Sequence, residues 1–239
     1  MLIAGFPAAA FGTNCYVLAT GPGQECLVVD PGVDVVGRLD AVLAEHRLKP
    51  VAVLLTHGHI DHTFSVTPVC GARDIPAYLH PEDGPMLADP LVGLGPETRA
   101  AFERTLTWTE PDDVRPLEDG AVLSLAGIEV TVDHAPGHTR GSVAFRVPYD
   151  GDDRVPEVML SGDLLFAGSI GRTDLPGGDH ATMLRSLAAK VLTLPDEVVV
   201  LPGHGDQTTI GQERAMNPFL QGLDSPTTGR VGTGPRRGL

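Results

Sequence analysis

The segment Thr56-His57-Gly58-His59-Ile60-Asp61-His62 places four potential metal ligands within six residues. It directly follows residues 51–55, an apolar run that predicts a strand buried on both faces. In a turning backbone the first two histidines can point to one side, and the Asp-His pair can begin a helix whose start faces the same cleft. Imidazoles and a carboxylate this crowded would repel or compete unless a cation organised them. The segment therefore predicts a metal site rather than a group of solvated surface histidines.

Three later segments share one format, in which a strand is followed by a tight turn that carries one potential ligand. The turns Pro136-Gly137-His138, Ser161-Gly162-Asp163 and Pro202-Gly203-His204 supply two imidazoles and one carboxylate. The glycine before each ligand permits a sharp turn and a close approach of the backbone. Each turn alone is common on protein surfaces. Together with the first segment they give five histidines and two aspartates, which is enough for two metal ions with open positions.

The remaining pattern predicts an α/β fold, a four-layer αββα sandwich of two sheets packed face to face with helices outside. Short apolar runs bounded by turn residues predict the strands, and apolar residues at helical spacing predict the helices. The predicted strands are 16–18, 26–29, 51–55, 121–125, 128–133, 142–147, 158–160 and 197–201, and the predicted helices are 36–47 and 181–192. Residues 81–116 are rich in Pro, Gly and acidic residues and predict short helices and loops.

A chain of 239 residues is long enough for one domain with a large core. We expect residues 1–222 to form that domain. Residues 223–239 consist mainly of Gly, Thr, Pro and Arg and predict a poorly ordered C-terminal tail.

The composition excludes several classes of partner. A net charge of −14 should repel nucleic acids and anionic lipid headgroups. No apolar stretch approaches the roughly 20 residues of a membrane helix, and the apolar N-terminus lacks the basic residues of a signal peptide. The three cysteines form no C-x-x-C pair and suit a reducing compartment as small core residues. We expect a cytoplasmic protein that binds neither nucleic acid nor membrane; the oligomeric state stays open.

The series T-H-G-H-I-D-H, P-G-H-T-R-G-S, S-G-D-L-L-F and L-P-G-H-G resembles the metallo-β-lactamase superfamily. The strings A-G-S-I-G-R-T-D at 167–174, T-I-G-Q-E at 209–213 and N-P-F at 217–219 resemble its glyoxalase II-like (hydroxyacylglutathione hydrolase-like) branch. The similarity runs from about residue 11 to about residue 222. It implies two divalent metal ions, zinc first and iron or manganese as alternatives. The implied ligands are His57, His59 and His138 for one ion and Asp61, His62 and His204 for the other, with Asp163 bridging them.

The resemblance also implies roles for two residues outside the ligand set. Asp30, in V-D-P-G, matches an aspartate that supports the ligand loop, although V-D-P-G is equally typical of a turn-forming aspartate. Arg172 matches a cation near the substrate, where its planar fork could hold a carboxylate. The alternative for Arg172 is a surface ion pair with Asp174 or Asp179.

The expected activity is hydrolysis of a small-molecule thioester. A metal-bound hydroxide would attack the carbonyl, with Asp61 and Asp163 as the catalytic carboxylates, and a thiolate needs little help to leave because its pKa is about 8.5. The sequence shows no Gly-x-Ser-x-Gly elbow for covalent catalysis. A helical extension like that with which full-length glyoxalase II proteins bind glutathione is not evident after His204, so the thiol stays open. The alternatives are a persulfide dioxygenase with one iron at His57, His138 and Asp163, a lactonase, and a non-catalytic metal-binding protein.

Overall fold

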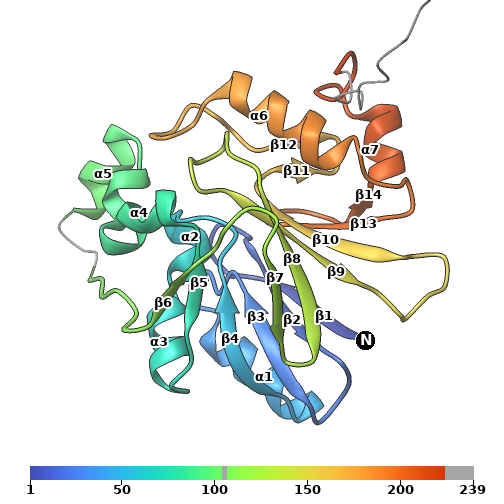
Figure 1. Cartoon of the computed structure of the whole chain (residues 1–239). Helices are drawn as coiled ribbons and strands as arrows, with labels where there is room; N and C mark the ends of the chain where they lie inside the picture. Colours follow the sequence, from blue (N-terminus) through green and yellow to red (C-terminus); the bar gives the residue numbers. More distant parts are fainter. Residues whose placement is uncertain (104–106, 224–239) are drawn as a thin grey trace, which may run out of the picture.

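The computed structural model describes residues 1–103 and 107–223, and two six-stranded sheets pack face to face in it. Helices cover the outer face of each sheet (Figure 1). This arrangement confirms the predicted α/β class and the four-layer αββα sandwich. Of the predicted tail, residues 224–239 lie outside the described residues.

The first sheet comes from the N-terminal half of the chain and has the order β1-β2-β3-β4-β5-β6. Strands β1, β2 and β3 pair antiparallel, and the pairings from β3 to β6 are parallel. The strands are β1 (Leu2–Pro7), β2 (Asn14–Ala19), β3 (Glu25–Val29), β4 (Lys49–Leu54), β5 (Ala77–Leu79) and β6 (Val114–Pro116). The sequence analysis did not predict β1, β5 and β6, and β6 lies in the region expected to hold only short helices and loops.

The second sheet has the order β14-β13-β10-β9-β8-β7, and its β10 and β13 pair in parallel while the other pairings are antiparallel. Its strands are β7 (Val122–Leu125), β8 (Ile128–His134), β9 (Val143–Pro148), β10 (Glu157–Gly162), β13 (Val199–Pro202) and β14 (Thr208–Thr209). A separate hairpin joins β11 (Leu165–Phe166) to β12 (Ser169–Ile170).

The helices are short, and most of them lie between strands that are parallel neighbours or in the insertion after β5. They are α1 (Val36–His46), α2 (Ile60–Thr63), α3 (Val66–Gly71), η1 (Pro81–Asp83), α4 (Gly84–Ala88), η2 (Pro90–Gly93), α5 (Pro96–Phe102), α6 (His180–Ser186), η3 (Leu187–Val191) and α7 (Ile210–Met216). The predicted helix 181–192 is therefore divided into the α-helical α6 and the π-helical η3.

The core has three apolar layers, one between the sheets and one under the helices on each outer side. Strand β4 shows why both faces of its sheet are buried. Ala52 and Leu54 pack between the sheets, whereas Val53 and Leu55 pack toward α1 and α3. The three cysteines are free and buried, as predicted for small core residues. In the described part of the chain no helix is long and apolar enough to cross a membrane.

Candidate metal centre

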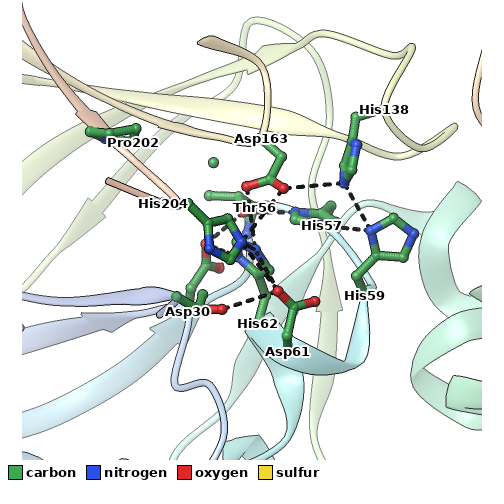
Figure 2. Close-up of polar contacts among 12 residues, drawn as sticks. Asp30, Thr56, His57, His59, Asp61, His62, His138, Asp163, Pro202 and His204 are labelled. Carbon is green, nitrogen blue, oxygen red and sulfur yellow. Dashed lines mark hydrogen bonds and ion pairs between the residues drawn. The ribbon is translucent and has the colours of Figure 1, made fainter. Parts of the chain in front are cut away.

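The ligand segment after β4 turns sharply before it enters the short helix α2. Its extended residue His59 precedes Ile60, the first residue of α2, so that Asp61 and His62 lie in the first turn as predicted. The turns after β8, β10 and β13 approach this segment from the second sheet (Figure 2). The seven predicted ligands therefore converge at one edge of the sandwich, and they form two groups that face a shared carboxylate.

The first group consists of His57, His59 and His138. His59 Nδ1 lies 3.1 Å from His57 Nε2 and 2.8 Å from His138 Nε2. Burial, followed by the charge of neighbouring histidines, lowers the pKa of His57 well below its usual value and that of His59 to about 3. All three rings are buried, so His57 and His59 should be neutral near pH 7.

Hydrogen bonds fix the tautomers of two rings of the first group. The His138 Nδ1–H donates to the Arg172 carbonyl oxygen at 2.7 Å. The Thr56 hydroxyl donates to Asp30 Oδ2 and so accepts from His57 Nδ1–H at 3.1 Å. The Nε2 lone pairs of His57 and His138 therefore point at His59 Nδ1, which can donate to only one of them. A cation between the three nitrogens would remove this conflict, which is the chemistry expected of a metal site.

The second group consists of Asp61, His62 and His204. Asp61 Oδ2 lies 3.2 Å from His204 Nε2 and 3.6 Å from His62 Nε2, and the two Nε2 atoms are 3.3 Å apart. Burial raises the pKa of Asp61, but the nearby imidazoles outweigh burial and hold it well below its usual range. For His62, burial alone would lower the pKa. The surrounding carboxylates have the larger effect, so the pKa of His62 is raised above its usual value. This negative field favours a cation.

Asp163 lies between the two groups. Its Oδ2 is 3.5 Å from His138 Nε2, and its Oδ1 is 3.4 Å from His62 Nε2. Among the described residues, Asp163 Oδ1 and His59 Nε2 are buried polar atoms without a hydrogen-bond partner of good geometry. A buried carboxylate oxygen without a donor is costly unless it faces a cation. The arrangement thus fits two metal ions that share Asp163.

Asp30 is a buried anchor of the ligand segment. Its carboxylate accepts hydrogen bonds from Thr56 N at 2.8 Å, from Thr56 Oγ1 at 2.6 Å and from His62 Nδ1 at 2.9 Å. The contact with His62 fixes that ring so that its Nε2 faces the second group. Asp30 adopts a left-handed backbone conformation, with φ of 48°, which aspartate tolerates better than most residues. This position suits the supporting role implied by the resemblance.

Asp83 is a second anchor, which the sequence interpretation missed. Its Oδ2 accepts from Gly58 N at 2.9 Å and from Thr139 Oγ1 at 2.6 Å, and its Oδ1 accepts from Gly141 N at 2.7 Å. It thereby joins the loop of His57 and His59 to the loop of His138. Gly58 permits this approach, because a Cβ there would lie 2.9 Å from the Met86 Cβ and 3.0 Å from the Asp83 carbonyl oxygen. No motif marks Asp83, because most of its donors are backbone amides.

The side chain of Arg172 is paired with an acidic neighbour and is not a free cation. It forms a two-pronged ion pair with Asp174, with contacts of 2.8 and 2.7 Å, and it is 60% exposed. Of the two interpretations given above, the structure shows the surface ion pair. The backbone of Arg172 also supports the metal centre, because its carbonyl oxygen orients the His138 ring. The sequence analysis did not predict this contact.

The loop of His204 is held by side chains from the first sheet, which the sequence interpretation also missed. Asn14 Nδ2 donates to the carbonyl oxygens of Pro202 and Gly205, and the Tyr16 hydroxyl donates to that of Pro202 at 2.8 Å. The Thr13 hydroxyl donates to Asp61 Oδ2 at 3.0 Å. The start of β2 therefore supports the second group.

A sandwich of two mixed sheets with histidine and aspartate ligands at one edge has the donor set of a metal centre. A family model described as the metallo-beta-lactamase superfamily matches residues 8–204, and the chain belongs to this family.

Curated relatives match nearly the whole chain. An uncharacterized protein of Mycobacterium tuberculosis is 50% identical over 93% of this chain and 99% of its own length. The probable metallo-hydrolase YqgX of Bacillus subtilis is 37% identical, covering 91% of this chain and 96% of that protein. The hydroxyacylglutathione hydrolase GloC of Haemophilus influenzae is 33% identical, covering 90% and 95% respectively.

Solved structures agree with the fold. The BLEG-1 B3 metallo-beta-lactamase has a TM-score of 0.76 at 38% identity, covering 92% of this chain and all of that one. TTHA1623 in a di-iron-bound form has a TM-score of 0.72 at 40% identity, covering 91% of this chain and all of that one. ETHE1 from Myxococcus xanthus, at 22% identity over 91% of this chain and 84% of its own and a TM-score of 0.71, shows the fold alone.

Proposed function

We propose that this protein is a metal-dependent hydrolase of small-molecule thioesters. The observation that carries the proposal is the pair of three-ligand groups on either side of Asp163. Divalent ions held there would lower the pKa of water to near neutral and polarise a carbonyl oxygen. A functional analogy comes from GloC, whose printed name, hydroxyacylglutathione hydrolase, describes a hydrolase of an acylated thiol.

The chain's own residues have separate tasks in this proposal. His57, His59 and His138 would hold one ion, and Asp61, His62 and His204 the other. Asp163 would set the spacing between them. Asp61 also lines the cavity, so its carboxylate lies where the substrate would enter as well as beside the second ion. Asp61 and Asp163 are therefore the carboxylates expected to affect turnover most.

Thioesters suit this site better than substrates with poorer leaving groups. Among the described residues that line the cavity, the only ionisable side chain outside the ligand set is Arg172, which is paired with Asp174. The site therefore offers no evident general acid for an alcohol or amine. A leaving thiolate needs none, since its pKa is about 8.5.

Metal analysis followed by a substrate panel tests the proposal. We expect two divalent ions per chain, zinc first and iron as the alternative favoured by the di-iron form of TTHA1623. Thioesters should be hydrolysed faster than lactones or a β-lactam. Asp163→Asn should retain about one ion or fewer and lose at least about 100-fold in kcat/KM. The exposed Asp113→Asn is the matched control.

A different result would reassign the protein. One iron per chain, with oxygen consumption on a persulfide and no thioester hydrolysis, would replace this proposal by the dioxygenase alternative. A metal-loaded protein that is folded but hydrolyses no substrate of the panel, and that unfolds when the ions are removed, would indicate a structural metal site.

A further inference from the structure

A cavity of about 500 Å³ lies over the two ligand groups. Its floor consists of ligands, among them His59, Asp61 and His204. Its walls come from four separate segments, namely the loop between β1 and β2, the η2–α5 insertion, the β11–β12 hairpin and the residues after Arg172. The volume is in the range of small-molecule sites.

The walls of this cavity are mainly apolar, and their polar side chains are those of Thr98, Ser169 and Arg172. The apolar side chains that line the walls include Phe11, Leu94, Phe102, Phe166, Ile170 and Leu175. Phe166 lies edge-on to the His204 ring, with 6.1 Å between the ring centroids, so the apolar surface reaches the ligand groups directly. Elsewhere in the wall, a Cβ on Gly95 would lie 3.8 Å from Leu175 Cδ2. The η2–α5 insertion therefore lies within contact distance of the segment after Arg172.

The charges around the cavity disfavour an anionic substrate. The single basic side chain among the described lining residues is Arg172, and its guanidinium already binds the Asp174 carboxylate. The chain as a whole carries a net charge of −14, which repels anions at long range. A carrier with two carboxylates, such as glutathione, would find no free guanidinium among the described residues that line the cavity.

We propose that the site selects thioesters with an apolar acyl group on a carrier thiol that is not multiply anionic. The acyl chain lies against the aromatic and aliphatic walls, with its carbonyl at the ligand groups, and the carrier extends toward solvent. This inference rests on the proposed function, and it adds the substrate class. It makes Leu94 and Leu175 specificity-determining residues, because they line the cavity and belong to neither ligand group.

The test compares acyl length and carrier charge in the metal-loaded protein. The substrates are acetyl and hexanoyl thioesters of N-acetylcysteamine, hexanoyl-glutathione and lactoylglutathione. A buried methylene is worth about 0.8 kcal/mol, or about fourfold. Hexanoyl has four more methylenes than acetyl, and with two to three of them buried we expect kcat/KM for hexanoyl to exceed that for acetyl by about 10- to 100-fold. We expect N-acetylcysteamine to be preferred over glutathione by at least about tenfold.

A double variant tests the walls. Leu94→Ala with Leu175→Ala should lower the hexanoyl-to-acetyl ratio by about tenfold. The control is Val122→Ala, on the exposed face of β7 and outside the cavity, which should leave the ratio unchanged. Equal rates for acetyl and hexanoyl, or a preference for lactoylglutathione, would overturn the inference and leave the proposed function standing.

A binding measurement separates this inference from the chemistry. Calorimetry with the metal-loaded wild-type protein compares the thioethers S-hexyl- and S-methyl-N-acetylcysteamine and S-hexylglutathione, which the site cannot hydrolyse. We expect the neutral hexyl compound to bind most tightly. If that order holds while no thioester is hydrolysed, the proposed function fails and the apolar selectivity of the cavity stands. If the order fails, the inference is wrong regardless of turnover.

Discussion

Two buried carboxylates outside the ligand set, Asp30 and Asp83, support the metal centre at the level of single residues. Asp30 reaches both ligand groups, since it binds His62 directly and orients His57 through the Thr56 hydroxyl. Asp83 binds only the loops of the first group. Residues of this kind orient ligands and commonly change metal affinity by about 10- to 100-fold when mutated.

Asp83→Asn should weaken one of the two metal sites, and Asp30→Asn should weaken both. In the wild type, both oxygens of each carboxylate accept hydrogen bonds. In each variant the new amide NH₂ would face one of these donors, so that hydrogen bond is lost and the loops lose their fixed positions. Zinc titration against a competing chelator resolves the two affinities, and we expect losses of about 10- to 100-fold at the affected sites.

The titration also contains its own control. If the two carboxylates had a purely structural role, both variants would lose thermal stability. They would not differ in the number of metal sites whose affinity falls. Equal losses at both sites in Asp83→Asn would contradict the proposed division of support.

At the level of elements, most of the longer strands and the ligand turns could be predicted from the sequence, whereas β1 and the short elements were not predicted. Strand β4 has an unbroken apolar run, and four ligands crowd within six residues after it. Strands β11, β12 and β14 have only two residues each, which is too short for any periodicity. Their conformation depends on tertiary partners. Asp83 escaped prediction for the same reason, since backbone amides leave no trace in the sequence.

The buried Glu213 of α7 is a tertiary partner of the β11–β12 hairpin. Its Oε2 accepts from Gly168 N at 2.8 Å and from Asn217 Nδ2 at 2.8 Å, and its Oε1 accepts from Thr208 Oγ1 at 2.6 Å. Gly168 forms the turn of the β11–β12 hairpin, with φ of +72°, and the strands of that hairpin line the cavity. Glu213 therefore ties α7 to a cavity wall.

Glu213→Gln should destabilise the fold by about 1–3 kcal/mol, because a buried donor would lose its acceptor. It should also raise KM for a hexanoyl thioester by loosening the hairpin. Urea unfolding with an unchanged m-value measures the first effect, and the exposed Glu197→Gln serves as the control. Wild-type stability in Glu213→Gln would show that the hairpin does not depend on this clamp.

At the scale of the whole molecule, each ligand group joins the two sheets. His57 and His59 follow β4 of the first sheet, whereas His138 follows β8 of the second. The same holds for the second group, in which His204 follows β13. An ion in either group would therefore connect the halves of the sandwich, and the crowded lone pairs would oppose that contact without it.

Metal removal should accordingly lower the stability of the whole fold. Binding to the folded state alone adds about 2.7 kcal/mol at a ligand concentration 100 times Kd, so chelation should lower Tm by several degrees. Scanning calorimetry before and after dialysis against a chelator measures this, with re-addition of zinc as the control. A Tm that does not change on complete removal would contradict the bridging role.

The buried thiols make the stability of the fold depend on alkaline pH. Burial is the main cause that raises the pKa of Cys26 and of Cys70 from 9.0 to about 12. The native state therefore holds these protons where the unfolded chain releases them. The stability they contribute is complete below about pH 9 and is lost as pH rises toward about 12.

Between pH 8 and pH 10.5 each thiol should then remove about 1–2 kcal/mol from the free energy of unfolding. Urea unfolding of the metal-free protein measures this loss, and the Cys26→Ala/Cys70→Ala variant should lose correspondingly less over the same interval. Because the thiols are buried and un-ionised, a disulfide reagent at pH 8 should label them only after unfolding. Equal losses in the wild type and the variant, or rapid labelling of the native protein, would show that these side chains ionise within the fold.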